Sequence, residues 1–422
     1  MRIEHNVLLD VAESDIGKNG SFSIPKSVTT IGNSAFYECE SLKEITIPNG
    51  VTAIGSSVFC GCESLRKITI PESVTAIEDY AFFGCESLEK ITIPNGVRVI
   101  GNSAFYGCES LKEIAIPNGV TVIGNFAFRR CKSLKKIIIP ESVTVIGSFA
   151  FYGCESLKEI TIPENVTTIG SYAFFECESL EKITIPNGVT TIGSSAFRRC
   201  KSLKEITIPE NVTTIENSAF DGCKSLKEIT IPENVTTIEN SAFDGCKSLK
   251  EITILNGMAS INDYAFENCE NLRQITFAGQ TYPVKCVDES CMRVLHKKQM
   301  KDITILKCMY FPNMDKTVYI AEKNGYTAHG ETIRNAVEDL QFKMLENVNL
   351  EEHIQRIKQQ GYMNANDYRL LTGACREGTN HFLQEHGLTW EDTMSVEQVL
   401  EITKGRYGFD KFQKIAEQIL QD

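Results

Sequence analysis

The chain has 422 residues and a formal net charge of −12 at pH 7, and 42% of its residues are hydrophobic. This length allows two or more domains, and the acidic balance argues against a nucleic acid as the partner. No run of 18 apolar residues occurs, so we expect no membrane span. The N-terminus lacks a long apolar segment and carries Glu4, Asp10, Glu13 and Asp15. We therefore expect no secretory signal peptide and a cytoplasmic location.

Residues 1–18 are expected to form an N-terminal cap, because Ile3, Val7 and Leu8 can cover the open end of the structure that follows. From residue 19 to residue 279 a 23-residue unit recurs in register, as Leu42 to Ser64 shows. Such a period predicts a solenoid, in which each unit is one coil. We number the coil from its Leu, so that a Cys occupies position 21 of every coil. This column comprises Cys39, Cys62, Cys85, Cys108, Cys131, Cys154, Cys177, Cys200, Cys223, Cys246 and Cys269.

Each coil contains two short extended segments. Ile45 and Ile47 alternate with polar residues, which predicts a strand with one buried face. Pro48 ends that strand because proline has no N–H for a ladder. Val51 and Ile54 mark the second segment, and the Ala-Phe-x-x-Cys stretch that closes the coil is expected to form a helical or 3₁₀ turn. A single coil buries too little to be stable alone, so neighbouring coils must share their apolar surface.

The cysteines are expected to be reduced thiols. Eleven of the sixteen belong to the single inward column, where they act as small hydrophobic residues. Parallel side chains in adjacent coils do not favour disulfide geometry.

The pattern L-x-x-I-x-I-P-x-x-V-T-x-I-G-x-x-A-F-x-x-C resembles the BspA-like class of bacterial leucine-rich repeats. The resemblance implies a curved leucine-rich-repeat superhelix with a parallel sheet on its concave side. It also implies an adhesion protein that binds other proteins, and the alternative to a cytoplasmic location is therefore the cell surface or secretion by a non-standard route. The pattern weakens where Leu255 replaces the proline, and it ends at Ala278-Gly279.

Two outward-facing surfaces of the solenoid are candidates for binding a protein. A threonine ladder at position 5, which includes Thr46, Thr69 and Thr207, is either a docking surface or ordinary strand filler. Positions 16 and 19 vary more between coils, and in the middle coils they carry aromatic residues and arginine. These residue types are typical of interface hot spots, although they also serve to shield the turn beneath them. The candidate partner-binding residues are Phe83, Tyr106, Phe126, Arg129, Phe149, Tyr152, Tyr172 and Phe175.

Residues 280–422 have a different composition and are expected to form a small α+β, mostly helical, C-terminal domain. We expect strands at Tyr282–Val287 and Ile303–Tyr310, a helix at Ser290–Met300 and a hairpin within Thr317–His329. Helices are expected from the apolar stripes of residues 333–344 and 350–357, from the capping box at Ser395 and Gln398, and over Asp410–Leu420.

Three groups in this domain have a chemical interpretation that is weaker than the structural one. Cys286, Cys291, His296 and Cys308 contain no close Cys-x-x-Cys pair, so buried thiols are favoured over a zinc site. Cys375 with His381 and His386 has no third orienting group for a nucleophile. The stretch from His329 to Thr332 fits a helix N-cap better than a phosphate site.

We therefore expect a non-enzymatic protein-interaction scaffold that uses the repeat surface and needs no cofactor or metal. The alternative is an intracellular effector or enzyme whose C-terminal domain carries the activity while the repeats select the target.

Overall fold

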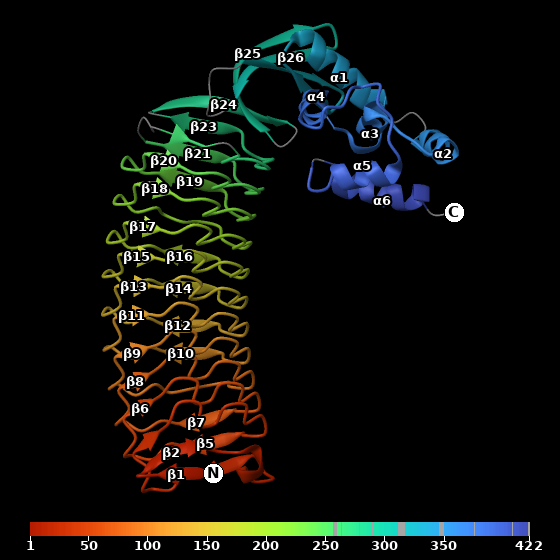
Figure 1. Cartoon of the computed structure of the whole chain (residues 1–422). Helices are drawn as coiled ribbons and strands as arrows, with labels where there is room; N and C mark the ends of the chain where they lie inside the picture. Colours follow the sequence, from red (N-terminus) through yellow and green to blue (C-terminus); the bar gives the residue numbers. More distant parts are fainter. Residues whose placement is uncertain are drawn as a thin grey trace. The chain divides into compact units, whose positions relative to one another are not determined.

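A computed structural model describes residues 1–255, 260–262, 264–277, 279–287, 290–310, 317–345, 350–374, 376–406 and 408–420. The chain divides into two compact units, Met1–Tyr282 and Pro283–Asp422. The first unit is a stack of coils that begins at the N-terminus (Figure 1). None of the described helices is long and apolar enough to cross a bilayer.

The first extended segment of the coil forms one row of short parallel strands. Glu44 pairs with Lys67 and Thr46 with Thr69, so partners are one repeat apart. The strands of this row are β3 (Ser21–Ser23), β5 (Glu44–Thr46), β7 (Lys67–Thr69), β10 (Glu113–Ala115), β12 (Lys136–Ile138), β14 (Glu159–Thr161), β16 (Lys182–Thr184), β19 (Glu228–Ile231), β21 (Glu251–Ile254) and β23 (Gln274–Phe277). We call their outward side the strand face.

The second segment forms another parallel row, which the N-terminal residues extend. Strand β1 (Arg2–Glu4) is antiparallel to β2 (Val7–Asp10), which precedes the short 3₁₀ helix η1 (Glu13–Asp15), and β2 pairs in parallel with β4 (Thr30–Ile31). The row continues through β6 (Ala53–Ile54), β8 (Ala76–Ile77), β9 (Val99–Ile100), β11 (Val122–Ile123), β13 (Val145–Ile146), β15 (Thr168–Ile169), β17 (Thr191–Ile192), β18 (Thr214–Ile215), β20 (Thr237–Ile238) and β22 (Ser260–Ile261). Leu8 is fully buried against the first coils.

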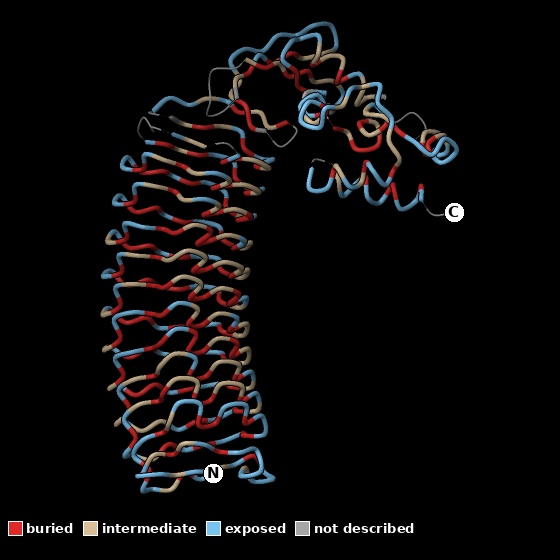
Figure 2. Tube along the Cα trace, in the orientation of Figure 1, coloured by how far each residue is buried: buried red, intermediate tan, exposed pale blue. Residues whose placement is uncertain are grey.

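A column of phenylalanine rings at position 18 forms the centre of the stack. The rings from Phe36 to Phe243 are fully buried and Phe266 is 4% exposed. Adjacent ring centroids lie 5.1 to 5.5 Å apart and most ring planes are nearly parallel. Buried residues accordingly form continuous rows through the coils (Figure 2). The coils therefore share one core, as the 23-residue period predicts.

The stretch that closes each coil is a series of turns, so the expected helical or 3₁₀ turn is wrong. In one coil Tyr37 N donates to Ser34 O and Cys39 N to Phe36 O, while Phe36 N bonds to Val58 O in the next coil. The backbone at positions 16 and 20 is left-handed, with φ of 59° at Ser34 and 56° at Glu38. A helix cannot continue through such residues, and the amides bond between coils instead.

The second unit begins with antiparallel strands. They are β24 (Gln280–Val287), β25 (Ser290–Met300), β26 (Ile303–Tyr310), β27 (Thr317–Lys323) and β28 (Tyr326–Gly330), and each pairs with the next. Helix α1 (Ile333–Leu345) packs on one side of this sheet through Ala336 and Leu340, which contact Ala321 and Ala328. The predicted strands at Tyr282–Val287 and Ile303–Tyr310, the hairpin and the helix that follows it are confirmed.

The helix expected at Ser290–Met300 is wrong, because these residues form the long strand β25. The run Leu295 to Met300 has good helix formers. However, β25 pairs with strands on both sides, and Met292 is fully buried in a cluster with Leu306 and Ile320. Cross-strand packing therefore outweighs local propensity.

The remaining helices pack around Phe412, which is fully buried. They are α2 (Leu350–Gln360), α3 (Ala365–Thr372), α4 (Arg376–Glu385), α5 (Val396–Ile402) and α6 (Phe409–Leu420). The predictions of α2, α5 and α6 are confirmed, and Ser395 caps α5 as expected. Sequence analysis missed α3 and α4, although Asn364 and Asp367 form a capping box at the start of α3.

Candidate functional site

The structure brings the eight predicted partner-binding residues together along the middle coils of the first unit. We call this set the aromatic edge: Phe83, Tyr106, Phe126, Arg129, Phe149, Tyr152, Tyr172 and Phe175. All eight are half-buried, because each packs on its neighbours and keeps one side open to solvent. The set is made of two parallel columns.

The position-16 column is a stack of three rings. The centroids of Phe126 and Phe149 lie 4.8 Å apart, those of Phe149 and Tyr172 lie 4.6 Å apart, and the planes are within 9° of parallel. Ser103 and Ser195 continue the column on either side and are only 5% and 3% exposed.

The position-19 column alternates rings with a cation. Phe83 stacks on Tyr106 at 4.6 Å, and Tyr152 stacks on Phe175 at 4.9 Å. The Arg129 guanidinium carbon lies between the pairs, 5.4 Å from the Tyr106 ring centroid and 4.4 Å from that of Tyr152. Cation–π attraction therefore joins the two pairs into one column. Arg129 Nε is buried and, within the described chain, has no hydrogen-bond partner.

The backbone makes the position-16 residues unusual. Phe126, Phe149 and Tyr172 have φ of 58°, 58° and 57°. A bulky residue in this left-handed region is uncommon, and serine occupies the position in most other coils. Because coils with serine at position 16 also close, a ring is not needed there for folding. The three aromatic residues therefore change the surface of these coils and not their fold.

The strand face is the other sequence candidate, and it carries threonine at position 5 in most coils, interrupted by Ala115 and by the exposed Ile138. Thr207, Thr230 and Thr253 line a hollow of about 360 Å³ in the later coils, and Thr46 and Thr69 line one of about 700 Å³ near the N-terminus. Both hollows are open to solvent and repeat the same residue from coil to coil. The strand face therefore offers less distinction between coils than the aromatic edge does.

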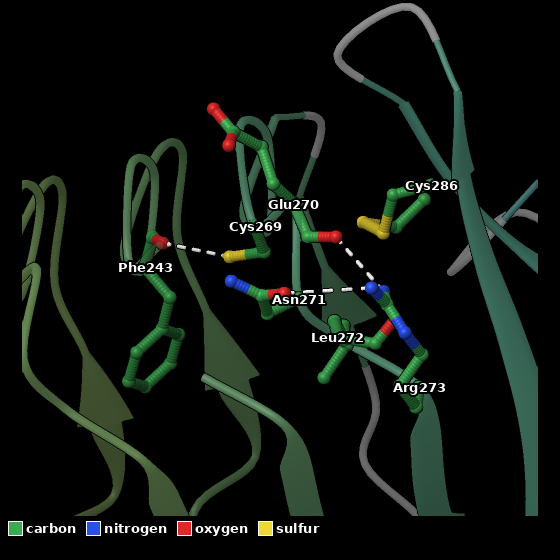
Figure 3. The surroundings of a disulfide bond; sticks show 8 residues. Phe243, Cys269, Glu270, Asn271, Leu272, Arg273 and Cys286 are labelled. Carbon is green, nitrogen blue, oxygen red and sulfur yellow. Dashed lines mark hydrogen bonds between the residues drawn. A yellow bond between two sulfur atoms is a disulfide. The ribbon is translucent and has the colours of Figure 1, made fainter. Parts of the chain in front are cut away.

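The cysteine column is buried and chemically quiet. From Cys62 onward each Sγ donates to the carbonyl of the position-18 Phe in the preceding coil, at 3.1 to 3.3 Å. Cys269 and Phe243 show this contact in Figure 3. Burial raises the pKa of Cys39 to about 11 and raises the pKa of Cys85 and Cys154 further. The thiols stay protonated at neutral pH, which suits a packing role.

Two cysteines of the second unit are not thiols, which corrects the sequence analysis. Cys286 and Cys291 face each other across β24 and β25 with a Cα–Cα distance of 4.0 Å and form a disulfide. Direct cross-strand pairing brings the two sulfur atoms together, and the spacing in sequence did not reveal that pairing. His296 is exposed and Cys308 is buried. Within the described residues no group of three metal-binding side chains comes together.

The geometry gives little support to a nucleophile at Cys375 or to a phosphate site at His329 to Thr332. Cys375 lies outside the described residues. The imidazole of His381 is exposed beside Glu385, and Nδ1 of His386 lies 2.8 Å from the backbone oxygen of Phe382. Asn335 N donates to Thr332 Oγ1, which is the contact of an N-cap at the start of α1.

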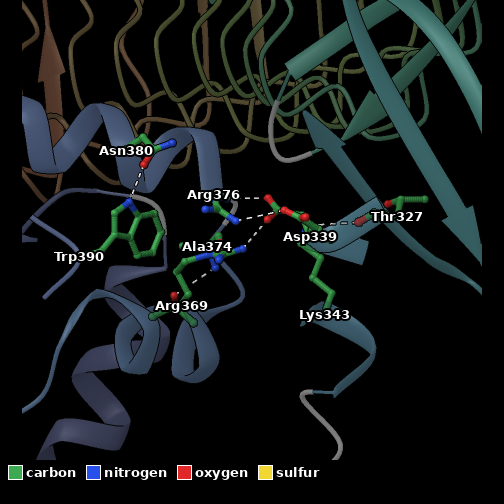
Figure 4. Close-up of polar contacts among 10 residues, drawn as sticks. Thr327, Asp339, Lys343, Arg369, Ala374, Arg376, Asn380 and Trp390 are labelled. Carbon is green, nitrogen blue, oxygen red and sulfur yellow. Dashed lines mark hydrogen bonds and ion pairs between the residues drawn. The ribbon is translucent and has the colours of Figure 1, made fainter. Parts of the chain in front are cut away.

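Sequence analysis also missed a buried ion pair in the second unit (Figure 4). Asp339 on α1 accepts from Arg369 on α3 at 2.7 Å and from the backbone N of Arg376, the first residue of α4, at 2.6 Å. The Arg369 guanidinium also lies 4.2 Å from the Phe342 ring centroid. With both carboxylate oxygens bonded, Asp339 ties three helices together, and no motif in the sequence marks it.

These features define a leucine-rich-repeat solenoid. The chain belongs to the family described as BspA type leucine rich repeat region, whose model matches residues 16–135, 75–204, 121–248 and 167–292. A comparison with curated proteins finds no match.

Several solved bacterial structures are similar to this chain. A leucine-rich repeat protein from Bacteroides ovatus is 31% identical over 60% of this chain and 77% of its own, with a TM-score of 0.45. A leucine rich cell surface protein from Faecalibacterium prausnitzii is 32% identical over 61% of this chain and 79% of its own, with a TM-score of 0.37. A leucine-rich repeat protein of T. pallidum is 36% identical over 36% of this chain and 72% of its own, with a TM-score of 0.35.

Proposed function

We propose that this protein is a non-enzymatic scaffold for protein–protein interaction and that the aromatic edge is its docking surface. The observation that carries the proposal is the pair of stacked aromatic and arginine columns, which are continuous in the middle coils and open to solvent. Aromatic residues and arginine dominate the binding energy of protein interfaces. Rings already stacked on one another lose little side-chain freedom on binding, which favours affinity.

The proposal is tested by capture with tagged full-length chain. Replacing Phe149 and Tyr172 by serine restores the residue found in most other coils and removes two rings of the edge. We expect this variant to fold and to lose the proteins that the unaltered chain captures from a bacterial lysate. Thr207→Ala with Thr230→Ala, on the strand face, is the matched control and should capture the same proteins as the unaltered chain. Capture lost only in the control variant would assign docking to the strand face instead.

We propose further that the protein works at the cell surface, the alternative location in the sequence analysis. The Cys286–Cys291 disulfide supports this location because disulfides persist in oxidising compartments. The buried thiols of the first unit are compatible with such a compartment, since they are inaccessible to oxidants. Cell fractionation with a tag on the chain tests this: recovery in the cytoplasmic fraction with a reduced Cys286 would contradict it.

A further inference from the structure

We propose that the protein docked at the aromatic edge is a second copy of this chain, bound antiparallel about a two-fold axis at the coil of Phe149 and Tyr152. This inference rests on the proposed function and names the partner of the same surface. In a two-fold interface a residue on the axis meets its own copy and every other residue meets a different one, so the surface must complement itself. Three features of the solenoid meet that condition.

The first feature is a charge column that changes sign along the solenoid. Position 22 follows position 19 by three residues, which span at most about 10 Å, so this column runs beside the aromatic edge. Glutamate prevails in the first coils and lysine in the later ones, because the column reads Glu40, Glu63, Glu86, Glu109, Lys132, Glu155, Glu178, Lys201, Lys224, Lys247 and Glu270. Like charges stacked in neighbouring coils repel one another within a single chain. A second chain with the opposite order would place Glu63, Glu86 and Glu109 against Lys247, Lys224 and Lys201.

The second feature is the position of the sign change. Glu86 and Lys224 each stand three coils from Glu155, which belongs to the coil of Phe149 and Tyr152. Glu63 and Lys247 each stand four coils from it, and Glu109 and Lys201 each stand two. An antiparallel copy turned about this coil therefore places all four lysines of the column opposite a glutamate, with Lys132 opposite Glu178, whereas Glu155 meets its own copy and Glu40 meets Glu270.

Within the described chain several of these charges lack an ionic partner. Glu63, Glu86 and Lys224 make no ion pair with any described residue. Lys132, Lys201 and Lys247 reach glutamates of neighbouring coils at 2.5 to 2.6 Å, namely Glu109, Glu178 and Glu270. The two-fold axis places Glu86 opposite Lys224, three coils from the centre. Within the described chain neither of these residues already makes an ion pair.

The third feature is the order of rings and cations at position 19. Rotation about the Tyr152 coil brings Arg129 of one copy opposite Phe175 of the other, and Arg198 opposite Tyr106. At position 16 it brings Phe126 opposite Tyr172 and Phe149 opposite itself. Cations thus meet rings and rings meet rings in the aromatic columns, and the charged column of position 22 flanks them, as the polar rim flanks the core of an interface.

The first experiment measures molar mass by sedimentation equilibrium on the full chain. The expected result is a reversible dimer of twice 47.1 kDa. The variant Glu63→Lys with Glu86→Lys and the variant Lys224→Glu with Lys247→Glu should each be monomeric, because like charges would then meet at both ends. Mixing the two variants, or combining all four changes in one chain, should restore the dimer. Glu228→Lys with Glu251→Lys, two exposed carboxylates on the strand face, is the matched control and should stay dimeric.

The second experiment tests the direction of the two copies by carbodiimide cross-linking and mass spectrometry. Glu86 and Lys224 lie six coils apart in one chain, about 29 Å at about 4.8 Å per coil, so a direct amide between them must join two copies. We expect this cross-link in the dimer band and its loss in the Phe149→Ser/Tyr172→Ser variant. A chain that is monomeric at every concentration would overturn the inference while leaving patch-dependent capture of other proteins intact. If the Phe149→Ser/Tyr172→Ser variant is still a dimer, this inference is overturned. The proposed function is overturned only if that variant captures other proteins as well as the unaltered chain does.

Discussion

The turn that closes each coil has an inner side, which faces the core, and an outer side, which faces solvent. The inner residues are the same from coil to coil, whereas the outer residues vary. On the inner side Phe151 and Cys154 belong to columns that run through every coil from Cys39 to Cys269, and both residues are fully buried. On the outer side Phe149 and Tyr152 belong to columns that change residue type from coil to coil and are continuously aromatic or arginine only in the middle coils. Identity from coil to coil therefore reports the packing that holds the solenoid together, and departure from it reports what one part of the solenoid does.

The inner side should fail at alkaline pH, which is the largest effect we expect. Burial raises the pKa of the column thiols above that in the unfolded chain, for Cys39 to about 11 and for the central thiols further. The folded state then holds protons that the unfolded state releases, so stability is complete below the unfolded pKa of about 8.5 and falls as the pH rises above it. Each buried thiol should remove about 1.4 kcal/mol per pH unit above that value.

Circular dichroism between pH 8 and pH 11 measures this loss. We expect cooperative unfolding of the coils above about pH 9, and a shallower pH dependence for Cys154→Ala with Cys177→Ala. Cys60, at outer position 19, is the comparison: burial raises its pKa too, but the residue is only partly buried, so Cys60→Ser should change the curve less than removing the two column thiols does. Stability that is flat up to pH 11 would contradict the buried thiol column.

Two phenylalanines two residues apart separate the inner role from the outer one. Phe151→Ala should lower the free energy of unfolding by about 3–5 kcal/mol, because it leaves a cavity between the Phe128 and Phe174 rings. Phe149→Ala should lower it by no more than about 1 kcal/mol, since that ring is half exposed and its neighbours can close over the gap. Urea titration of both variants measures the difference, and equal losses would place Phe149 in the core.

Arg129 should have an intermediate effect. Arg129→Gln removes the cation between Tyr106 and Tyr152 and should destabilise the chain by about 0.5–2 kcal/mol. Arg66→Gln, an exposed arginine of the same solenoid, should change stability by less than about 0.5 kcal/mol. If thermal unfolding ranks the two variants alike, the cation–π column does not hold the aromatic edge together.

The left-handed backbone predicts the smallest effect, and one of opposite sign. Ser218 has φ of 53° at position 16, so Ser218→Gly should stabilise the chain by about 0.5–1 kcal/mol by relieving the side-chain clash. Phe149→Gly should not stabilise it, because two stacking contacts are lost together with the strain. Chemical denaturation of both glycine variants checks the prediction, and stabilisation by Phe149→Gly would show that its stacking is negligible.

Sequence analysis was more accurate for the residues that repeat in every coil than for features that the repeat does not specify. A strict period places Phe36, Cys39 and every equivalent residue on one line, because adjacent coils must bury the same positions. The pairing of Phe149 with Tyr172 followed from that line. The left-handed φ of Phe149 did not, since no glycine marks the position.

The second unit has no sequence repeat, so equivalent residues elsewhere in the chain do not correct a misleading local pattern. Ser290–Met300 was assigned by helix propensity and forms a strand, because its partners β24 and β26 come from other parts of the chain. The Cys286–Cys291 disulfide and the Asp339–Arg369 ion pair likewise depend on contacts that only the assembled fold creates.

The most direct test of the account is binding by a folded Phe149→Ser/Tyr172→Ser chain. The variant is tested for capture of other proteins and of the unaltered chain. The urea unfolding midpoint is measured on the same preparation of the variant. The account predicts that binding is lost while the unfolding free energy stays within about 1–2 kcal/mol of the unaltered chain. Binding retained at full strength by the folded variant would contradict it.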